Sequence, residues 1–201
     1  GKSLELGGVN QSEMQFLSEN LGYALRVTKI VKTTDGGLNW NNQTIDLYGN
    51  KSLTGVYFID SNTGFICSRG IGTDTSGIIY KTTDGGNNWN RIPSANIPVP
   101  LQDEFGVATY FSFLDNDIWF STVISNNAEY RDSRSFHSSD GGLTWAAEIT
   151  DASYVSFVDA EHGLVKNIYN DLFRTSFDGG STWQDGIVPV GYIASLVMIP
   201  A

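Results

Sequence analysis

The chain has 201 residues, of which 40% are hydrophobic and 17% charged, with 22 glycines and 5 prolines. This composition is typical of a globular, turn-rich domain and excludes a disordered chain. The net charge of −10 opposes binding to phosphate backbones, so we expect no nucleic-acid partner. No apolar run approaches the roughly 20 residues of a membrane span, so we expect no membrane insertion.

A nine-residue segment recurs four times along the chain. Its copies are KTTDGGLNW (32–40), KTTDGGNNW (81–89), HSSDGGLTW (137–145) and TSFDGGSTW (175–183). Self-similarity at intervals of this length predicts a repeat architecture such as a solenoid or a propeller.

Each copy follows a segment that reads as a strand, a tight polar turn and a second strand. These segments are MQFLSENLGYAL (14–25), VYFIDSNTGFI (56–66), FSFLDNDIWF (111–120) and VSFVDAEHGLV (155–165). A third strand then enters the Asp-Gly-Gly sequence and a fourth leaves from the tryptophan. Four short antiparallel strands per repeat are typical of one propeller blade. We therefore predict an all-β chain, a β-propeller with four complete four-stranded blades.

The repeats predict a single domain over 1–201. We place the blades at about 12–50, 53–98, 106–150 and 153–187, and expect 190–201 to begin a further blade or to supply a closing strand. Two arrangements stay open: a closed ring of four to five blades, or a piece of a larger propeller.

The Asp-Gly-Gly sequences, called DGG turns below (35–37, 84–86, 140–142 and 178–180), have a physical reason for their composition. Paired glycines accept the positive φ angles that a hairpin turn needs, and the aspartate can accept backbone N–H groups of its own turn. The tryptophan places a large apolar ring between sheets. We expect a structural role for Asp35, Trp40, Asp84, Trp89, Asp140, Trp145, Asp178 and Trp183.

The pattern Ser/Thr-x-Asp-x-Gly-x-x-Trp resembles the Asp-box of sialidase-type (BNR) repeats. The sequence TTDGGxxW, preceded by F-(I/L/V)-D-x-x-x-G, is similar to the photosystem II stability/assembly factor family of propellers. The resemblance covers about 12–187, and Ser138, Ser176 and Phe177 depart from it. It implies a propeller fold and a protein partner, although Asp-boxes also occur in sialidases, xyloglucanase-like glycosidases and sorting receptors.

Length variation among the repeats gathers on the propeller face opposite the DGG turns. Loops 68–77 and 124–135 of blades 2 and 3, and the link 92–106 between these blades, are long. Long loops on a rigid scaffold often carry binding sites, although they can also be merely tolerated. The candidate partner contacts in these loops are Arg69, Asp74, Asp103, Glu104, Glu129, Tyr130, Arg131 and Arg134.

Enzyme patterns find little support. A sialidase needs converging arginines, but Arg91 follows the second repeat turn instead of preceding the first, and adjacent Glu129 and Tyr130 would point to opposite faces of a strand. A glycosidase with paired carboxylates, Asp103 or Glu104 opposite Glu129 or Asp132, stays open as an alternative. We assign no catalytic residue.

We expect neither a cofactor nor a metal, because His137 and His162 are isolated and the single cysteine, Cys67, lies in a strand-like apolar run. The sequence thus favours a non-catalytic scaffold that binds another protein through the loops of blades 2 and 3. The alternative is a carbohydrate-active protein with a glycan ligand. We expect a secreted, periplasmic or cell-surface location in a bacterium, with the leader removed.

Overall fold

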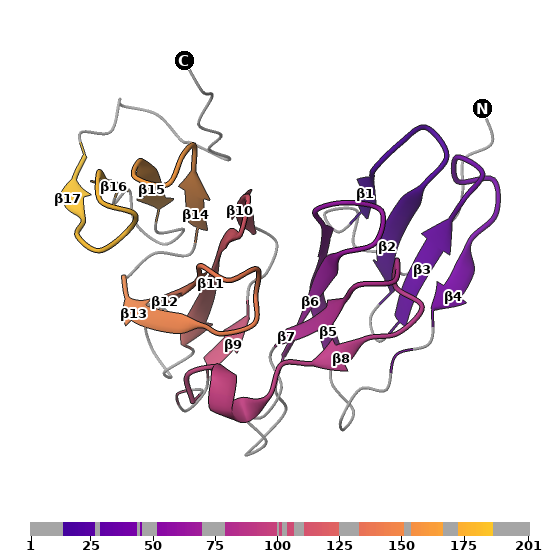
Figure 1. The fold of residues 1–201 in the computed structure, drawn as a ribbon, viewed down its shortest axis with the longest axis horizontal. Coiled ribbons are helices and arrows are strands. Elements are labelled where there is room, and N and C mark those ends of the chain that lie inside the picture. Colours follow the sequence, from indigo (N-terminus) through magenta and orange to yellow (C-terminus); the bar gives the residue numbers. More distant parts are fainter. Residues whose placement is uncertain are drawn as a thin grey trace. The chain divides into compact units, whose positions relative to one another are not determined.

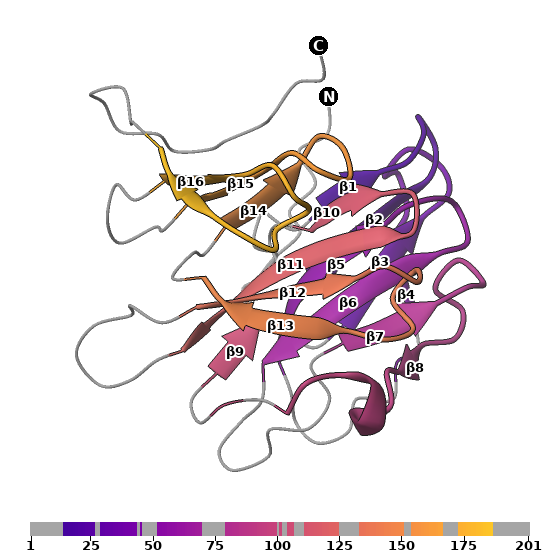
Figure 2. The same ribbon diagram turned by 60° about the vertical axis from the view of Figure 1, so that its left-hand side comes forward.

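A computed structural model gives the fold, and the regular structure is almost entirely β (Figures 1 and 2). The chain divides into two compact units, unit 1 (Gly1–Ile92) and unit 2 (Pro93–Ala201), which we describe separately. The residues that the structure describes are 14–26, 29–43, 45, 52–69, 79–99, 101, 104–106, 111–124, 133–150, 154–166 and 173–186. The segment 190–201, predicted to begin a further blade or to close the ring, lies outside them.

Unit 1 contains two antiparallel sheets of four strands each, and in both sheets the strand order follows the chain. Blade 1 consists of β1 (Met14–Phe16), β2 (Gly22–Arg26), β3 (Lys29–Thr33) and β4 (Asn41–Gln43). Blade 2 consists of β5 (Ser52–Phe58), β6 (Gly64–Arg69), β7 (Ile79–Thr82) and β8 (Asn90–Arg91). Two of the predicted blades are therefore present in this unit.

Unit 2 repeats the same pattern. Blade 3 consists of β10 (Ser112–Leu114), β11 (Asp117–Ile124), β12 (Arg134–Ser138) and β13 (Ala146–Ile149). Blade 4 consists of β14 (Tyr154–Phe157), β15 (Gly163–Lys166), β16 (Phe173–Ser176) and β17 (Gln184–Asp185). The all-β fold with four complete four-stranded blades that the sequence predicts is confirmed in the described part of the chain.

The link 92–106, which the sequence predicts to be long, contains regular structure among its described residues. It contains a 3-10 turn, η1 (Ser94–Asn96), and a short strand, β9 (Glu104–Gly106), which pairs antiparallel with the end of β11. Blade 3 thus has a fifth strand, because the chain pairs with the extended β11 before it enters β10.

In all four blades, an equivalent hydrogen bond joins two turns of the same blade. In each blade the first glycine of the DGG turn donates its N–H to a carbonyl of the turn between the first two strands. The four bonds are Gly36 to Asn20, Gly85 to Asn62, Gly141 to Asn116 and Gly179 to Glu161, at 2.8–3.0 Å. Both turns of a blade therefore lie at the same end of its sheet, as the repeat pattern predicts.

The second strands of blades 1, 2 and 3 supply much of the buried core. In β2 the side chains of Tyr23 and Leu25 are buried, and in β6 Phe65, Ile66 and Cys67 are completely buried. A strand that is apolar on both faces must be covered on both faces. The free thiol of Cys67 belongs to this core, where burial raises its pKa well above the usual value.

Candidate functional site

The DGG turns are held together by a hydroxyl and a carboxylate inside each turn. In blade 1 the hydroxyl of Thr33 donates to Asp35 Oδ1 (2.8 Å) and accepts the N–H of Gly37 (2.8 Å), while Asp35 Oδ1 accepts the N–H of Asn39 (2.9 Å). Thr82, Ser138 and Ser176 play the same part in the other turns. All eight glycines have φ between 69° and 91°, a conformation that strains any other residue.

These hydrogen bonds stabilise the ionised aspartates. The backbone N–H of Asn88, followed by its side-chain amide and the hydroxyl of Thr82, lowers the pKa of Asp84 to about 2. The pKa values of Asp35 and Asp178 are lowered in the same way. Carboxylates that accept this many bonds in their own turns are poorly suited to acid–base work at neutral pH.

The tryptophan of each turn packs edge-on against a phenylalanine. The ring pairs are Phe16–Trp40, Phe58–Trp89, Phe120–Trp145 and Phe157–Trp183, with centroids 5.2–6.0 Å apart. In blades 1, 2 and 4 the phenylalanine comes from the first strand and lies over the glycine that begins the second strand. A β-carbon on Gly64, for example, would lie 2.7 Å from the Phe58 ring.

Blade 3 solves the same packing problem differently. Phe113 keeps the register of the other first-strand phenylalanines, but it pairs with the fully buried Ile118 where the other blades have glycine. The isoleucine fills the space that the aromatic ring takes elsewhere. The ring against Trp145 is therefore Phe120, two residues further along β11, and Phe113 packs against Phe111 instead.

Within unit 1, three side chains of blade 1 bind blade 2. Gln15 exchanges two hydrogen bonds with the backbone of Phe58 (2.7 and 2.8 Å). Tyr23 stacks on Phe58 and donates its hydroxyl to the carbonyl of Gly85 (3.0 Å). Lys32 donates to the same carbonyl from Nζ (2.9 Å). Burial of the Tyr23 phenol raises its pKa to about 12, so it stays a donor at neutral pH.

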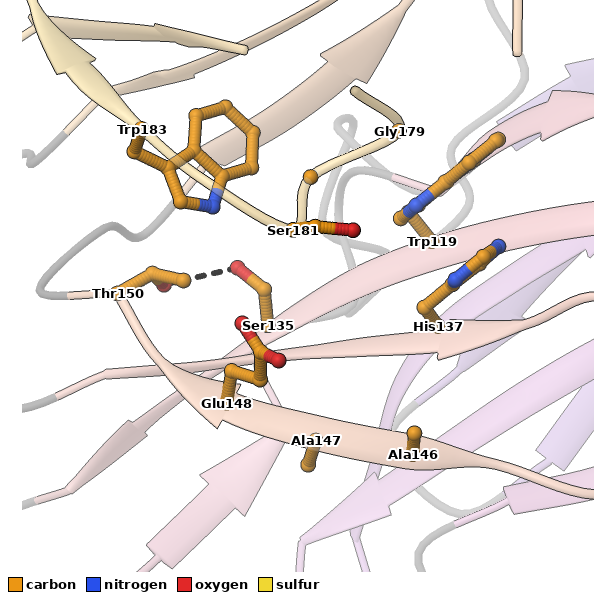
Figure 3. Close-up of a pocket in the computed structure, with 11 residues that line it drawn as sticks. Trp119, Ser135, His137, Ala146, Ala147, Glu148, Thr150, Gly179, Ser181 and Trp183 are labelled. Atoms are coloured by element: carbon orange, nitrogen blue, oxygen red, sulfur yellow. Dashed lines mark hydrogen bonds between the residues drawn. The ribbon is translucent and has the colours of Figure 1, made fainter. Parts of the chain in front are cut away.

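Blade 3 contacts blade 4 at the equivalent positions within unit 2. Ser112 Oγ accepts the N–H of Phe157 (2.8 Å), and Trp119 stacks on Phe157 with centroids 4.0 Å apart. His137 stacks on the other face of Trp119 (4.6 Å) and bonds Asp117 through Nε2 (2.7 Å). A pocket of about 90 Å³ opens between these residues and the DGG turn of blade 4 (Figure 3).

The lining of this pocket combines aromatic, hydroxyl and acidic groups. Trp119 and His137 stand on one side and Trp183 on the other, with Ser181 between them, and Ser135 donates to or accepts from Thr150 at 2.8 Å (Figure 3). Glu148 contributes the one carboxylate of the lining. The residues lining this pocket are Trp119, Ser135, His137, Ala146, Ala147, Glu148, Thr150, Gly179, Gly180, Ser181 and Trp183.

Two of the predicted loop contacts, Glu104 and Arg134, come together in a buried ion pair. Arg134 Nε donates to Glu104 Oε1 (2.8 Å), its Nη2 bonds Glu104 Oε2, and Nη2 also reaches the carbonyl of Val99. The side chains are 0% and 9% exposed for Glu104 and Arg134. Neither charge is free for a partner, so we assign this pair to holding β9 and the link onto blade 3.

The side chains of the other predicted partner contacts lie outside the described residues. Arg69 ends β6, and its side chain is outside the described part of the chain. Asp74, Asp103, Glu129, Tyr130 and Arg131 also lie outside it. A glycosidase would need Asp103 or Glu104 to lie opposite Glu129 or Asp132. Glu104 is ion-paired with Arg134, and the pairing of Asp103 stays a prediction.

Sequence reasoning missed the pocket. Its distinguishing residues are Asp117, Trp119 and His137, which occupy the places of Leu21, Tyr23 and Lys32 in blade 1. The sequence signal for this pocket is a difference in residue type between repeats at the positions where one blade contacts the next. Residues that all four repeats share do not indicate it.

Two general features concern the described residues only. They contain no group of three or more His, Cys, Asp or Glu side chains arranged to hold a metal ion. None of their helical segments is long and apolar enough to cross a membrane.

Comparison with known proteins agrees with the repeat architecture. The sequence model of the family described as photosynthesis system II assembly factor YCF48 matches residues 3–153. Among solved structures, YCF48 from Cyanidioschyzon merolae is 18% identical with a TM-score of 0.58, and the match covers 86% of this chain and 55% of that one. An ancestral GH74 enzyme is also 18% identical, with a TM-score of 0.63, covering 92% of this chain and 25% of that one.

At these identities the solved structures establish the propeller fold alone. The chain spans about half the length of the YCF48 structure and about a quarter of the GH74 enzyme. No curated protein sequence matches it.

Proposed function

The chain belongs to the family of the photosynthesis system II assembly factor YCF48, and we propose that it is a non-catalytic propeller that binds another protein during the assembly of a larger complex. The observation that carries this proposal is the family match over residues 3–153, which include the first three blades. An assembly factor acts by contact with a protein, so a protein is the partner to seek.

The build of the blades supports a scaffold role. The acidic residues of the DGG turns accept hydrogen bonds from their own turns, and each unit is stitched from blade to blade by buried contacts such as Tyr23–Phe58 and Trp119–Phe157. Such packing gives a rigid frame, and the loops outside it can differ in length and sequence. Binding scaffolds usually combine a rigid frame with variable loops in this way.

For the binding surface we propose the loops of blades 2 and 3, around 68–77 and 124–135. The side chains that this proposal offers to a partner are Arg69, Asp74, Glu129, Tyr130 and Arg131, together with Asp103 of the link 92–106. The buried pair Glu104–Arg134 supports it indirectly, because it anchors both the link 92–106 and the start of β12 at the base of the second loop.

The test is affinity capture by the full chain from cells of its source, followed by reconstitution with the purified captured protein. The matched variant replaces 126–132 by a short Gly-Ser turn and keeps Arg134, so that the buried ion pair survives. We expect a saturable complex with a subunit of a multi-subunit assembly, and its loss in the loop variant at unchanged stability. A complex that the loop variant forms equally well would refute the loop surface and leave the protein-binding role.

The GH74 likeness raises a carbohydrate-active alternative, but a likeness of fold does not carry a substrate. A glycan array and hydrolysis assays on sialosides and β-glucans distinguish the carbohydrate-active protein from the protein-binding scaffold.

We also propose a secreted, periplasmic or cell-surface location, on the grounds of composition, and fractionation of the source cells tests it.

A further inference from the structure

A lysine of blade 1 reaches across to the DGG turn of blade 2. Lys32 Nζ donates to the carbonyl of Gly85, the first glycine of the neighbouring DGG turn (2.9 Å), and lies 5.4 Å from the centre of the Tyr23 ring. The Tyr23 hydroxyl donates to the same carbonyl (3.0 Å). Unit 1 thus shows how an ammonium group is bound at this place in the repeat.

Both of these donors are replaced at the equivalent place between blades 3 and 4. Trp119 stands where Tyr23 does and has no hydroxyl, and His137 stands where Lys32 does. His137 bonds Asp117 at 2.7 Å instead of reaching across, and Asp117 occupies the place of Leu21 in blade 1. Among the described residues, no side chain bonds the carbonyl of Gly179, which corresponds to that of Gly85. The pocket, whose lining includes Gly179, lies at the place where Lys32 meets Gly85 in unit 1.

The charges around this pocket favour a cation. Glu148 in the lining is exposed, and its carboxylate has no hydrogen-bond or ion-pair partner among the described residues. The guanidinium of Arg174 reaches the carbonyl of Thr150 at the pocket, but it pairs with Asp185 at 3.0 Å. The chain as a whole carries a net charge of −10, so long-range attraction acts in the same direction.

We propose that this pocket binds a lysine side chain presented by the protein partner, and this inference rests on the protein-binding function proposed above. The ammonium group donates to the carbonyl of Gly179, as Lys32 does to Gly85, and Glu148 supplies the one carboxylate of the pocket lining. The hydroxyls of Ser135, Thr150 and Ser181 offer further acceptors around it.

The size and chemistry of the pocket select this occupant. Pockets that bury drug-sized ligands measure roughly 300–1,000 Å³, whereas this one measures about 90 Å³. This volume suits the end of one side chain. A compact ammonium also suits a single carbonyl acceptor better than the planar guanidinium of arginine, which favours bidentate partners.

The experiment is an NMR titration of the intact chain with Nα-acetyl-lysine N-methylamide. The norleucine analogue, which lacks the ammonium group, and the glutamine analogue, which carries a neutral amide, serve as matched probes. The five tryptophans give five indole N–H signals. We expect the lysine probe to shift the signals of Trp119 and Trp183 in a saturable way while those of Trp40 and Trp89 stay unchanged. We expect the norleucine probe to shift none of these four signals.

Variants make the test specific. Glu148→Gln should weaken the lysine probe about three- to fivefold, the amount expected for one exposed ion pair, whereas Glu19→Gln, the same charge change at an exposed site of unit 1, should not. The double variant Asp117→Leu/His137→Lys installs the residues that blade 1 has at these places. It should fill the pocket from within and abolish binding of the probe at unchanged stability.

Three results would overturn the inference: no shift with the lysine probe, equal shifts with the norleucine or glutamine probe, or undiminished binding by the double variant. Because the probe is a single amino-acid derivative, each of these results concerns the pocket alone. Failure of the proposed function is measured separately, by the absence of any protein complex in the capture and reconstitution experiment.

Discussion

Tyr23 of blade 1 stacks on Phe58 of blade 2 with ring centroids 3.7 Å apart, and its hydroxyl reaches past that ring to the carbonyl of Gly85. One side chain thus contacts both the core aromatic residue and the DGG turn of the next blade. Trp119 on Phe157 repeats the stacking in unit 2 without the hydroxyl. The two units therefore share the stacking between neighbouring blades and differ in the hydrogen bond that accompanies it.

Two substitutions at Tyr23 separate its two roles. Tyr23→Phe removes one hydrogen bond while Lys32 still serves the carbonyl, so we expect a loss of about 1 kcal/mol in the free energy of unfolding. Tyr23→Ala also removes the stacked ring and should cost about 3–5 kcal/mol. Urea denaturation of both variants measures the difference, and equal losses would show that the stacking contributes nothing.

The aromatic ring over the first glycine of the second strand leaves no room for a side chain. Gly64→Ala brings a β-carbon to 2.7 Å from the Phe58 ring, and we expect this overpacking to destabilise the chain by about 1–3 kcal/mol. Gly186→Ala is the matched control, because its β-carbon would meet its neighbours at 3.5 Å or more. Thermal unfolding of the two variants compares them, and an equally small effect of both would contradict the packing account.

The lowered pKa of Asp84 predicts a dependence of stability on pH. Its pKa is about 2 in the folded chain against an ordinary value of 3.8. The unfolded chain therefore binds a proton first, so the contribution of Asp84 to stability is present above about pH 4 and is lost as the pH falls towards 2. Asp84→Asn should make the stability profile shallower over this interval in urea titrations. An unchanged profile would mean that the carboxylate is not stabilised in the turn.

The buried pair Glu104–Arg134 should behave as a unit. Arg134→Met leaves a buried, uncompensated carboxylate and should cost about 3–5 kcal/mol. The double variant Glu104→Leu/Arg134→Met removes both charges and should recover most of that loss. Chemical denaturation of the single and double variants gives the coupling energy, and strictly additive losses would contradict the pairing.

The fold could be predicted from the sequence because its determinants are local. Each DGG turn carries its own glycines, hydroxyl and aspartate within seven residues, from Thr33 to Asn39 in blade 1, and the strands follow from the spacing between turns. The exchange of Phe113 for Phe120 in blade 3 was not predicted. It follows from Ile118 at a place where the other blades have glycine, and that signal is visible only once the register is known.

The candidate site was less accessible to sequence reasoning, because it depends on pairs that are distant in the chain. Glu104 and Arg134 read as two charged loop residues, and their pairing across the sheet end takes them out of the surface. The pocket has His137 bonded to Asp117 in its wall, a contact that no sequence motif predicts. Arg69, Asp74, Asp103, Glu129, Tyr130 and Arg131 remain predicted partner contacts.

The central claim is that this propeller binds a protein and does not process a glycan. The most direct test measures the intact chain against its purified captured partner by surface plasmon resonance, beside a glycan array run with the same preparation. We predict a saturable protein complex and a blank array. A reproducible glycan hit, together with no saturable binding to any protein, would contradict the account.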